Sequence, residues 1–227
     1  MTETVLSLEN VHKRFQKGDQ KIHVLRGINL SIQAGESVAI VGQSGSGKST
    51  FLQLLGFLDR PTTGELTFMN IRQAGMSTHQ LDRLRNQSIG FIFQFHHLLP
   101  DHDALENVMM PLLISGRSKK EAHQRAVDLL LRVGLGGRMY HKPGELSGGE
   151  QQRVAVARSL ITSPKLVLAD EPTGNLDPQT SVDIMDLLLS LTSEIGGSLV
   201  MVTHNISLAQ KCDRFLRLQE GVFVEET

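Results

Sequence analysis

Residues 37–50 read SVAIVGQSGSGKST, and the fold is predicted from this stretch outward. It starts with an apolar run, continues through a loop with three glycines and ends in lysine, serine and threonine. Residues 42–50 fit G-x-x-x-x-G-K-[ST], in which glycines let backbone N–H groups curve around phosphate oxygens at a helix start. The stretch therefore predicts a strand, a phosphate-binding loop and a helix that continues through STFLQLLGFL.

This loop predicts the binding of a nucleotide together with Mg²⁺. Lys48 is expected to reach the β- and γ-phosphates and neutralise their charge, and the Ser49 hydroxyl is expected to bind the metal. The loop residues that we expect to contact the nucleotide are Gly42, Gln43, Ser44, Gly45, Ser46, Gly47, Lys48, Ser49 and Thr50.

Two further apolar runs, KLVLAD (165–170) and SLVMVT (198–203), share the character of SVAIVG (37–42). None of the three alternates, which is typical of strands buried on both faces of a parallel sheet. Each precedes a polar turn and a helical pattern, so they predict βα units. In the first 35 residues, TVLSLENVHKRF and VLRGINLSI alternate more strongly, which predicts antiparallel strands.

The middle of the chain, from about residue 96 to 162, is predicted to be helical. The segment SKKEAHQRAVDLLLRVGL carries an apolar stripe at helical spacing, and Ser118 with Glu121 predicts a capping box at its start. Asp177 followed by Pro178 predicts another helix start.

Two acids follow the second apolar run. Asp170 directly after a buried strand suits a Mg²⁺ ligand in nucleotide hydrolysis, bound directly or through water. Glu171, one step further along, suits a general base that polarises the attacking water.

A second helix start that favours anions lies at residues 145–153, ELSGGEQQR. Ser147 and Glu150 predict a capping box. Gly148 and Gly149 occupy the first turn, where ordinary helix formers would serve, and the close approach of a ligand to backbone N–H groups would explain them. Since residues 42–50 already cradle phosphate, this second cradle is redundant unless it faces a different nucleotide.

The composition excludes several classes of protein. With 227 residues and a net charge of −1, the chain suits one globular domain and offers no basic surface for nucleic acid. The single cysteine, Cys212, allows no intrachain disulfide and fits a reducing compartment. The N-terminus lacks a signal-peptide pattern, and no apolar run approaches the ~18 residues of a membrane span. We expect a soluble chain that can dock on a membrane protein.

Six motifs, in order and over nearly the whole chain, resemble those of the ATP-binding cassette (ABC) ATPases. GQSGSGKST resembles Walker A, LVLADE (166–171) resembles Walker B, and LSGGEQ (146–151) resembles the family signature. Gln94 in IFQ resembles the Q-loop, GNLD (174–177) the D-loop, and His204 after MVT the switch histidine.

The resemblance implies an α/β fold of the P-loop NTPase type. A mixed central sheet would carry an N-terminal antiparallel β-subdomain and an inserted α-helical subdomain. One nucleotide-binding domain would span residues 1–227, with the catalytic core and β-subdomain at 1–95 and 163–227 and the helical signature subdomain at 96–162.

The resemblance also implies ATP as the nucleotide and a role for each motif. Glu171 would polarise the attacking water and His204 would hold the γ-phosphate. Gln94 would help Ser49 and Asp170 to organise the metal, partly through water.

The family arrangement further implies a second copy of the chain. Two subunits would pair head to tail, so that the signature of one closes over ATP bound to the other. The residues expected at this shared face are Ser147, Gly148, Gly149, Glu150 and Asp177. Phe15, just after the first strand, would stack on adenine, where tyrosine is more usual.

Within the family, residues 91–114 and 170–177 are similar to the ATPases of lipoprotein-releasing complexes. This implies an ATPase that powers the release of lipoproteins from the inner membrane toward the outer membrane. It would bind integral membrane permease subunits as a peripheral homodimer at the cytoplasmic face of the bacterial inner membrane, with no nucleic-acid partner. His96 and His97 project apart without a further ligand nearby, so we interpret them as a contact surface for the membrane subunit.

Other cargoes and outputs stay open. Macrolide or peptide exporter ATPases share ADEPTGNLD. We expect no fused membrane domain after residue 227, which weakens the interpretation as a full-length macrolide exporter but not as a separate exporter subunit. A cell-division regulatory ATPase of this superfamily is a second alternative, against which QFHHLLPD argues. A DNA-repair ATPase would carry a coiled coil or zinc insertions, and the sequence predicts neither.

Overall fold

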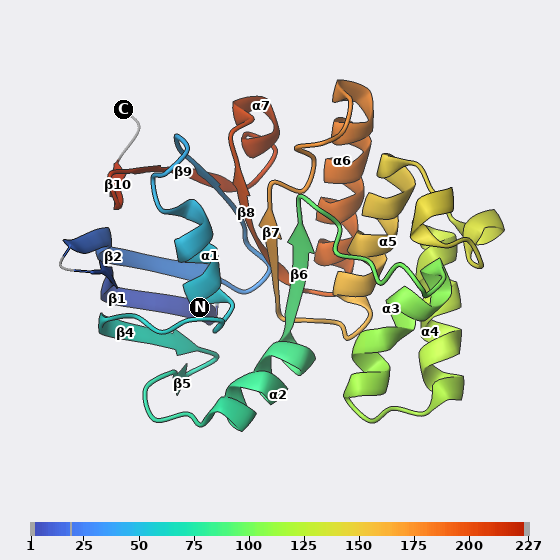
Figure 1. The fold of residues 1–227 in the computed structure, drawn as a ribbon, viewed down its shortest axis with the longest axis horizontal. Helices are drawn as coiled ribbons and strands as arrows, with labels where there is room; N and C mark the ends of the chain where they lie inside the picture. Colours follow the sequence, from blue (N-terminus) through green and yellow to red (C-terminus); the bar gives the residue numbers. More distant parts are fainter. Residues whose placement is uncertain (1–2, 19, 225–227) are drawn as a thin grey trace.

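The structure, a computed structural model, describes residues 3–18 and 20–224. Two β-sheets and the helices form layers, with the larger sheet at the centre (Figure 1). Within the described ranges, no helix is both long enough and apolar enough to cross a membrane.

The central sheet has six strands, which in chain order are β3 (Ser37–Val41), β6 (Ile89–Phe93), β7 (Leu166–Asp170), β8 (Ser198–Thr203), β9 (Arg214–Gln219) and β10 (Val222–Val224). Their order across the sheet is β10-β9-β3-β8-β7-β6. Neighbours pair in parallel except β10, which is antiparallel to β9, so the sheet is mixed as expected. The three apolar runs form β3, β7 and β8, which are buried along almost their whole length and are therefore covered on both faces.

The smaller sheet forms the predicted N-terminal β-subdomain. Its strands are β1 (Thr4–Lys17), β2 (Gln20–Gln33), β4 (Thr63–Phe68) and β5 (Ile71–Arg72), in the order β2-β1-β4-β5. All neighbouring pairs are antiparallel, which confirms the prediction for the first 35 residues.

Helix α1 (Lys48–Leu55) joins the two sheets. Its side chains Phe51, Leu52, Leu54 and Leu55 are buried in one apolar cluster with residues of β1, β2, β4 and the central strands. The helix that begins in the phosphate loop is therefore held on both sides, and the loop is fixed at its helical end.

The opposite face of the central sheet carries the helices α3 (Ala104–Ile114), α4 (Lys119–Arg132), α5 (Gly148–Leu160) and α6 (Pro178–Glu194). Helices α3, α4 and α5 lie together at the side of the molecule away from β1 and β2 (Figure 1). Helix α5 packs directly on β6, and α6 packs on β8. Short 3₁₀ turns at Gly136–Arg138 and Pro143–Glu145 link α4 to α5. Apolar residues of all four helices form a single cluster with Ala39, Val167 and Met201 of the sheet.

The helix starts follow the capping residues, with one partial exception. Ser147 and Glu150 form the complete capping box of α5, and Asp177 caps α6 by accepting from the Thr180 N–H at 3.0 Å. Ser118 caps α4 through the Glu121 N–H at 3.1 Å, but the predicted reciprocal bond from Glu121 is not part of this cap. The Glu121 carboxylate instead pairs with Arg125 at 3.3 Å, because both side chains lie on the same face of the helix.

The structure contains elements that the sequence analysis did not predict. Besides β4, β5, β6, β9 and β10, these are α2 (Thr78–Ser88) and α7 (Ile206–Ala209). Only Leu81 of α2 is buried, so this helix has no apolar stripe that would reveal it. The missed strands are short; β4, β6 and β9 pair with strands far away in the sequence, and β5 and β10 are brief antiparallel partners of β4 and β9.

Candidate active site

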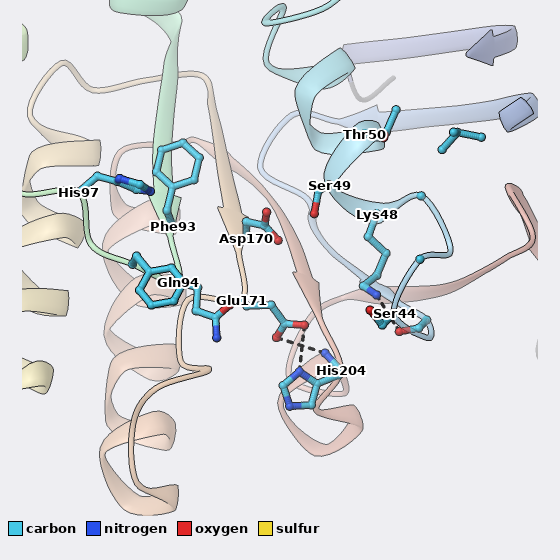
Figure 2. Close-up of a pocket in the computed structure, with 15 residues that line it drawn as sticks. Ser44, Lys48, Ser49, Thr50, Phe93, Gln94, His97, Asp170, Glu171 and His204 are labelled. Carbon is cyan, nitrogen blue, oxygen red and sulfur yellow. Dashed lines mark hydrogen bonds and ion pairs between the residues drawn. The ribbon is translucent and has the colours of Figure 1, made fainter. Parts of the chain in front are cut away.

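The ends of three neighbouring central strands meet at one edge of the sheet. Strand β3 runs into residues 42–50, β7 ends at Asp170 before Glu171, and β8 precedes His204. These segments surround a cleft of about 700 Å³ (Figure 2). The predicted residues that line it are Gly42, Ser44, Gly45, Gly47, Lys48, Ser49, Thr50, Gln94, Asp170, Glu171 and His204.

The remaining loop residues line an adjoining space. Gln43 and Ser46 border a second cavity of about 470 Å³, which shares Gly42, Ser44, Gly45 and His204 with the first. Four further residues line the first cleft without having been predicted from the sequence, namely Val24, Phe93, Phe95 and His97. Phe93 and Phe95 flank Gln94 in the chain, which was the available signal. Val24 comes from β2 and is brought in only by the packing of the β-subdomain.

At two positions of the loop, steric constraints require glycine. Gly47 has φ +104°, a left-handed conformation, and a Cβ there would lie 3.1 Å from both Val24 and Leu25. A Cβ at Gly42 would lie 2.4 Å from the carbonyl oxygen of Leu218 in β9. The tight approach of β2 and β9 to this loop therefore requires both glycines.

Lys48 folds back over its own loop. Its Nζ donates to the carbonyl oxygen of Gly42 at 2.8 Å (Figure 2) and to that of Gln43 at 2.9 Å. The ammonium group is thus held at the centre of the loop by neutral acceptors. A phosphate oxygen that entered the loop would offer a charged acceptor in their place.

Asp170 faces Ser49 across the cleft (Figure 2). Partial burial raises the pKa of the Asp170 carboxyl, and the neighbouring Glu171 carboxylate raises it further. A hydrogen bond from Ser49 and the charge of Lys48 act in the opposite direction. The cleft therefore holds two close carboxyl groups that a cation would stabilise in their ionised forms.

Glu171 and His204 contact each other directly. The Glu171 Oε1 atom lies 3.0 Å from the His204 ring Nδ1, and Oε2 accepts from the His204 backbone N–H at 3.3 Å (Figure 2). Glu171 has φ +47°, an unusual conformation for a residue with a side chain. Backbone strain of this kind clusters at functional sites, where it aims a side chain that the regular strand would not place there.

Gln94 is tied to a residue that the analysis did not single out. Its Nε2 donates to Asn175 Oδ1 at 3.2 Å, and Asn175 Nδ2 donates to the Gln94 carbonyl oxygen at 3.1 Å. Asn175 belongs to the GNLD segment (174–177), so the motif itself could have indicated it. This pair connects the segment after β6 to the turn before α6.

The signature residues lie apart from this cleft. Ser147, Gly148, Gly149, Glu150 and Asp177 line a separate open cavity of about 480 Å³, which shares no lining residue with the first cleft. A Cβ on Gly149 would lie 2.9 Å from Thr180 Cγ2, so this glycine has an intramolecular reason. A Cβ on Gly148 would lie 3.5 Å from Leu176 Cδ2, an ordinary van der Waals distance, so no contact within the chain requires this glycine. The second cradle therefore does not face the nucleotide site of its own chain.

Phe15 lies within β1 and not just after the first strand as predicted, because that strand continues to Lys17 in its pairing with β2. It is 40% exposed and lines neither the cleft nor the adjoining cavity. It is thus not a core residue, and its partner across the hairpin is Ile22, which is also exposed. The contact with adenine stays a prediction.

His96 and His97 have different neighbours, as predicted. The His96 Nδ1 atom contacts Gln152 of α5, whereas the His97 ring packs edge-to-face on Phe93 at 5.1 Å between ring centres. Arg158 of α5 donates to both of their backbone carbonyl oxygens at 2.6 Å. The segment after Gln94 is therefore fixed to the signature helix.

Comparison with known proteins agrees with this geometry. The family model for the ABC transporter matches residues 25–174. The lipoprotein-releasing system ATP-binding protein LolD of Legionella pneumophila is 48% identical over 221 residues, which cover 97% of both chains. The LolD protein of Hydrogenovibrio crunogenus is 50% identical over 224 residues, 99% of this chain and 97% of the relative.

Solved structures give the same assignment. A dimeric structure of the ATP-binding cassette MJ0796, in a post-hydrolysis state bound to ADP and Pi, superposes with a TM-score of 0.89. Its sequence identity is 42%, and the match covers 98% of this chain and 97% of that chain. These comparisons confirm the resemblance that the six motifs predicted. The chain belongs to the ABC transporter family of ATP-binding proteins.

Proposed function

We propose that this chain is the ATP-hydrolysing subunit of a bacterial ABC transporter that powers the release of lipoproteins from the inner membrane toward the outer membrane. The observation that carries the ATPase assignment is the meeting of the phosphate loop, two carboxylates and His204 in one cleft. The cargo is inferred from relatives that share about half of their residues with this chain over nearly its full length.

Residues 42–50 are proposed to bind the phosphates of ATP, with Lys48 on the β- and γ-oxygens. The hydroxyl of Ser49 and the carboxylate of Asp170 are hard oxygen donors that suit Mg²⁺, and Gln94 would assist them through water. The raised pKa of Asp170 fits this assignment, because a cation would remove the cost of two close carboxylates. When bound, the metal would neutralise charge on the phosphate oxygens.

The raised pKa of Asp170 predicts the effect of Asp170→Asn without nucleotide. At a pH above the folded-state pKa of Asp170, its ionised carboxylate lowers the free energy of unfolding, because this group ionises more readily in the unfolded chain. At a pH well below about 4, Asp170 is protonated in both the folded and the unfolded state, and this penalty vanishes. We expect Asp170→Asn to raise the melting temperature at pH 7, because the amide carries no charge to bury. The gain should disappear as the pH falls, and Mg²⁺-dependent hydrolysis should be lost. A variant that is less stable at pH 7 would contradict the assignment.

Glu171 is proposed as the general base, and His204 as the residue that holds the γ-phosphate and orients Glu171. The support is their contact at 3.0 Å inside the cleft and the left-handed backbone that directs Glu171 there. The nucleophile is water, whose proton Glu171 would accept as the oxygen attacks the γ-phosphorus.

Replacing Glu171 by Gln should remove the base while keeping the shape of the site. We expect ATP binding to persist and hydrolysis to fall roughly 100- to 10,000-fold, the usual contribution of a general base. Turnover by phosphate release and binding by calorimetry separate the two effects. Glu194→Gln, which alters an exposed carboxylate on α6, is the matched control. Rapid turnover by Glu171→Gln would refute the base assignment.

The active enzyme is proposed to be a head-to-tail pair of chains. The signature cavity shares no residue with the nucleotide cleft of the same chain, so each site is complete only when a second copy supplies Ser147 and its neighbours. Hydrolysis would remove the γ-phosphate that both chains contact, and the pair would then open because the contacts favouring the closed state are gone.

Ser147→Arg should block closure by placing a bulky side chain at the helix start. We expect nucleotide affinity of the monomer to be unchanged, and ATP-dependent dimers and turnover to be lost, as measured by light scattering and phosphate release. Ser118→Arg removes an equivalent serine cap at α4 and should keep both activities. Normal hydrolysis by Ser147→Arg would disprove the shared site.

The membrane partner is proposed to dock beside the segment that follows Gln94. Phe95 is 69% exposed, and His97 lines both the nucleotide cleft and a neighbouring groove with Leu58, Phe91 and Pro111. This apolar groove adjoins the nucleotide cleft. A permease subunit bound in it, at the cytoplasmic face of an inner membrane, would therefore contact residues that also line the nucleotide site.

The cargo is tested by recovering tagged Glu171→Gln from native membranes with ATP and identifying its partners by mass spectrometry. We expect integral membrane permease subunits together with lipoproteins. Recovery of an exporter with an outer-membrane channel, or of division proteins, would overturn the cargo and keep the ATPase. Lys48→Ala, recovered in parallel, controls for partners that bind without nucleotide.

A further inference from the structure

Lys13 of β1 is a buried charged residue that the proposed mechanism does not use. It is only 8% exposed, and its Nζ forms an ion pair with Asp59 Oδ2 at 2.6 Å and donates to the Arg60 carbonyl oxygen at 2.8 Å. Withdrawing an ammonium group from water is costly even when it is paired, and a well-packed apolar residue is often an equal or better solution for stability. Stability alone therefore does not explain why a lysine is buried at this position.

The same ammonium group lies over the ring of Phe15. The distance from Nζ to the ring centre is 4.9 Å, within the range of a cation–π contact. Phe15 itself is 40% exposed. Because the ammonium group over the ring is itself buried, the exposed area of Phe15 belongs to the part of the side chain that Lys13 does not cover.

The anchor of Lys13 is rigidly placed. Thr62, in the same loop as Asp59 and Arg60, accepts from the Arg14 N–H through its hydroxyl at 2.9 Å and donates its own N–H to the His12 carbonyl oxygen at 2.8 Å. The loop is thus bonded to β1 on both sides of Lys13. The ammonium group has little freedom to leave the ring.

We propose that Lys13 is a positioning residue for the nucleotide base, acting through Phe15. This rests on the proposed binding of ATP and on the predicted contact between Phe15 and adenine. A cation on one face of an aromatic ring holds the ring in place and draws electron density toward itself, so that the open face repels the π-cloud of a purine less. The Phe15 ring, which is otherwise exposed on the β1–β2 hairpin, is then held in place before the nucleotide binds. Less conformational entropy is therefore lost when adenine stacks on it.

The test is a double-mutant cycle read by equilibrium binding of ADP and UDP, which avoids turnover. Lys13→Met keeps the alkyl stem and removes the charge; Phe15→Leu keeps bulk and removes the ring. We expect each single variant to weaken ADP about 3- to 10-fold, the range of a partly desolvated cation–π contact, and UDP by less than about twofold. The double variant should lose no more than Phe15→Leu alone, because Lys13 acts through the ring.

Two controls separate positioning from folding. Asp59→Asn removes the ion pair but leaves the ammonium group over the ring, so its preference for ADP over UDP should stay within about twofold of the unmodified chain. Lys13→Gln can still donate to Arg60 and offers a second neutral variant should Lys13→Met not fold, and thermal melts accompany each variant.

The outcomes distinguish this inference from the site itself. If Phe15→Leu binds ADP like the unmodified chain, the adenine contact of Phe15 fails, and the role of Lys13 fails with it. If Phe15→Leu weakens ADP but neutral variants of Lys13 do not, only the role of Lys13 is overturned. An equal loss from Lys13→Met in the Phe15→Leu background would also overturn it, because the effect would not pass through the ring.

Discussion

Parallel pairing of three neighbouring strands, β3, β8 and β7, is the constraint on which the site depends. The carboxyl ends of parallel strands point to the same edge, so the loop after β3, the acids after β7 and His204 after β8 must lie together. Burial on both faces fixes these strands in register, since a shifted strand would carry its following turn out of the cleft. Helix α1, clasped between the two sheets, fixes the loop from its other end.

Within this frame the polar groups of the cleft hold one another. Lys48 bonds to carbonyls of its own loop, Glu171 bonds to His204, and Gln94 exchanges hydrogen bonds with Asn175. Phosphate oxygens could replace the carbonyl partners of Lys48. Binding would then exchange hydrogen bonds within the protein for stronger charge-assisted ones, with little rearrangement of the backbone.

One chain carries two helix N-termini that suit phosphate. Because they lie in separate cavities, a single chain cannot bring both to the same nucleotide. The first lies in the cleft, and the second opens on a different cavity beside the start of α6. His96 and Arg158 connect the segment after Gln94 to the helix that begins at Ser147. These contacts join the segment after Gln94 to α5, whose first turn faces the second cavity.

The sequence by itself determined the local features of this protein. The phosphate loop, the buried strands, the caps at Ser147 and Asp177 and the family motifs are set by short-range pattern, because each depends on neighbours within a few residues. The structure alone decided what distant segments share: the entry of Val24 into the cleft, the pairing of Gln94 with Asn175, and the burial of Lys13 against Asp59. It also revealed α2, whose exposed face leaves no periodic signal. These contacts join residues tens of positions apart, and only the packing of one sheet and its helices against another brings them together.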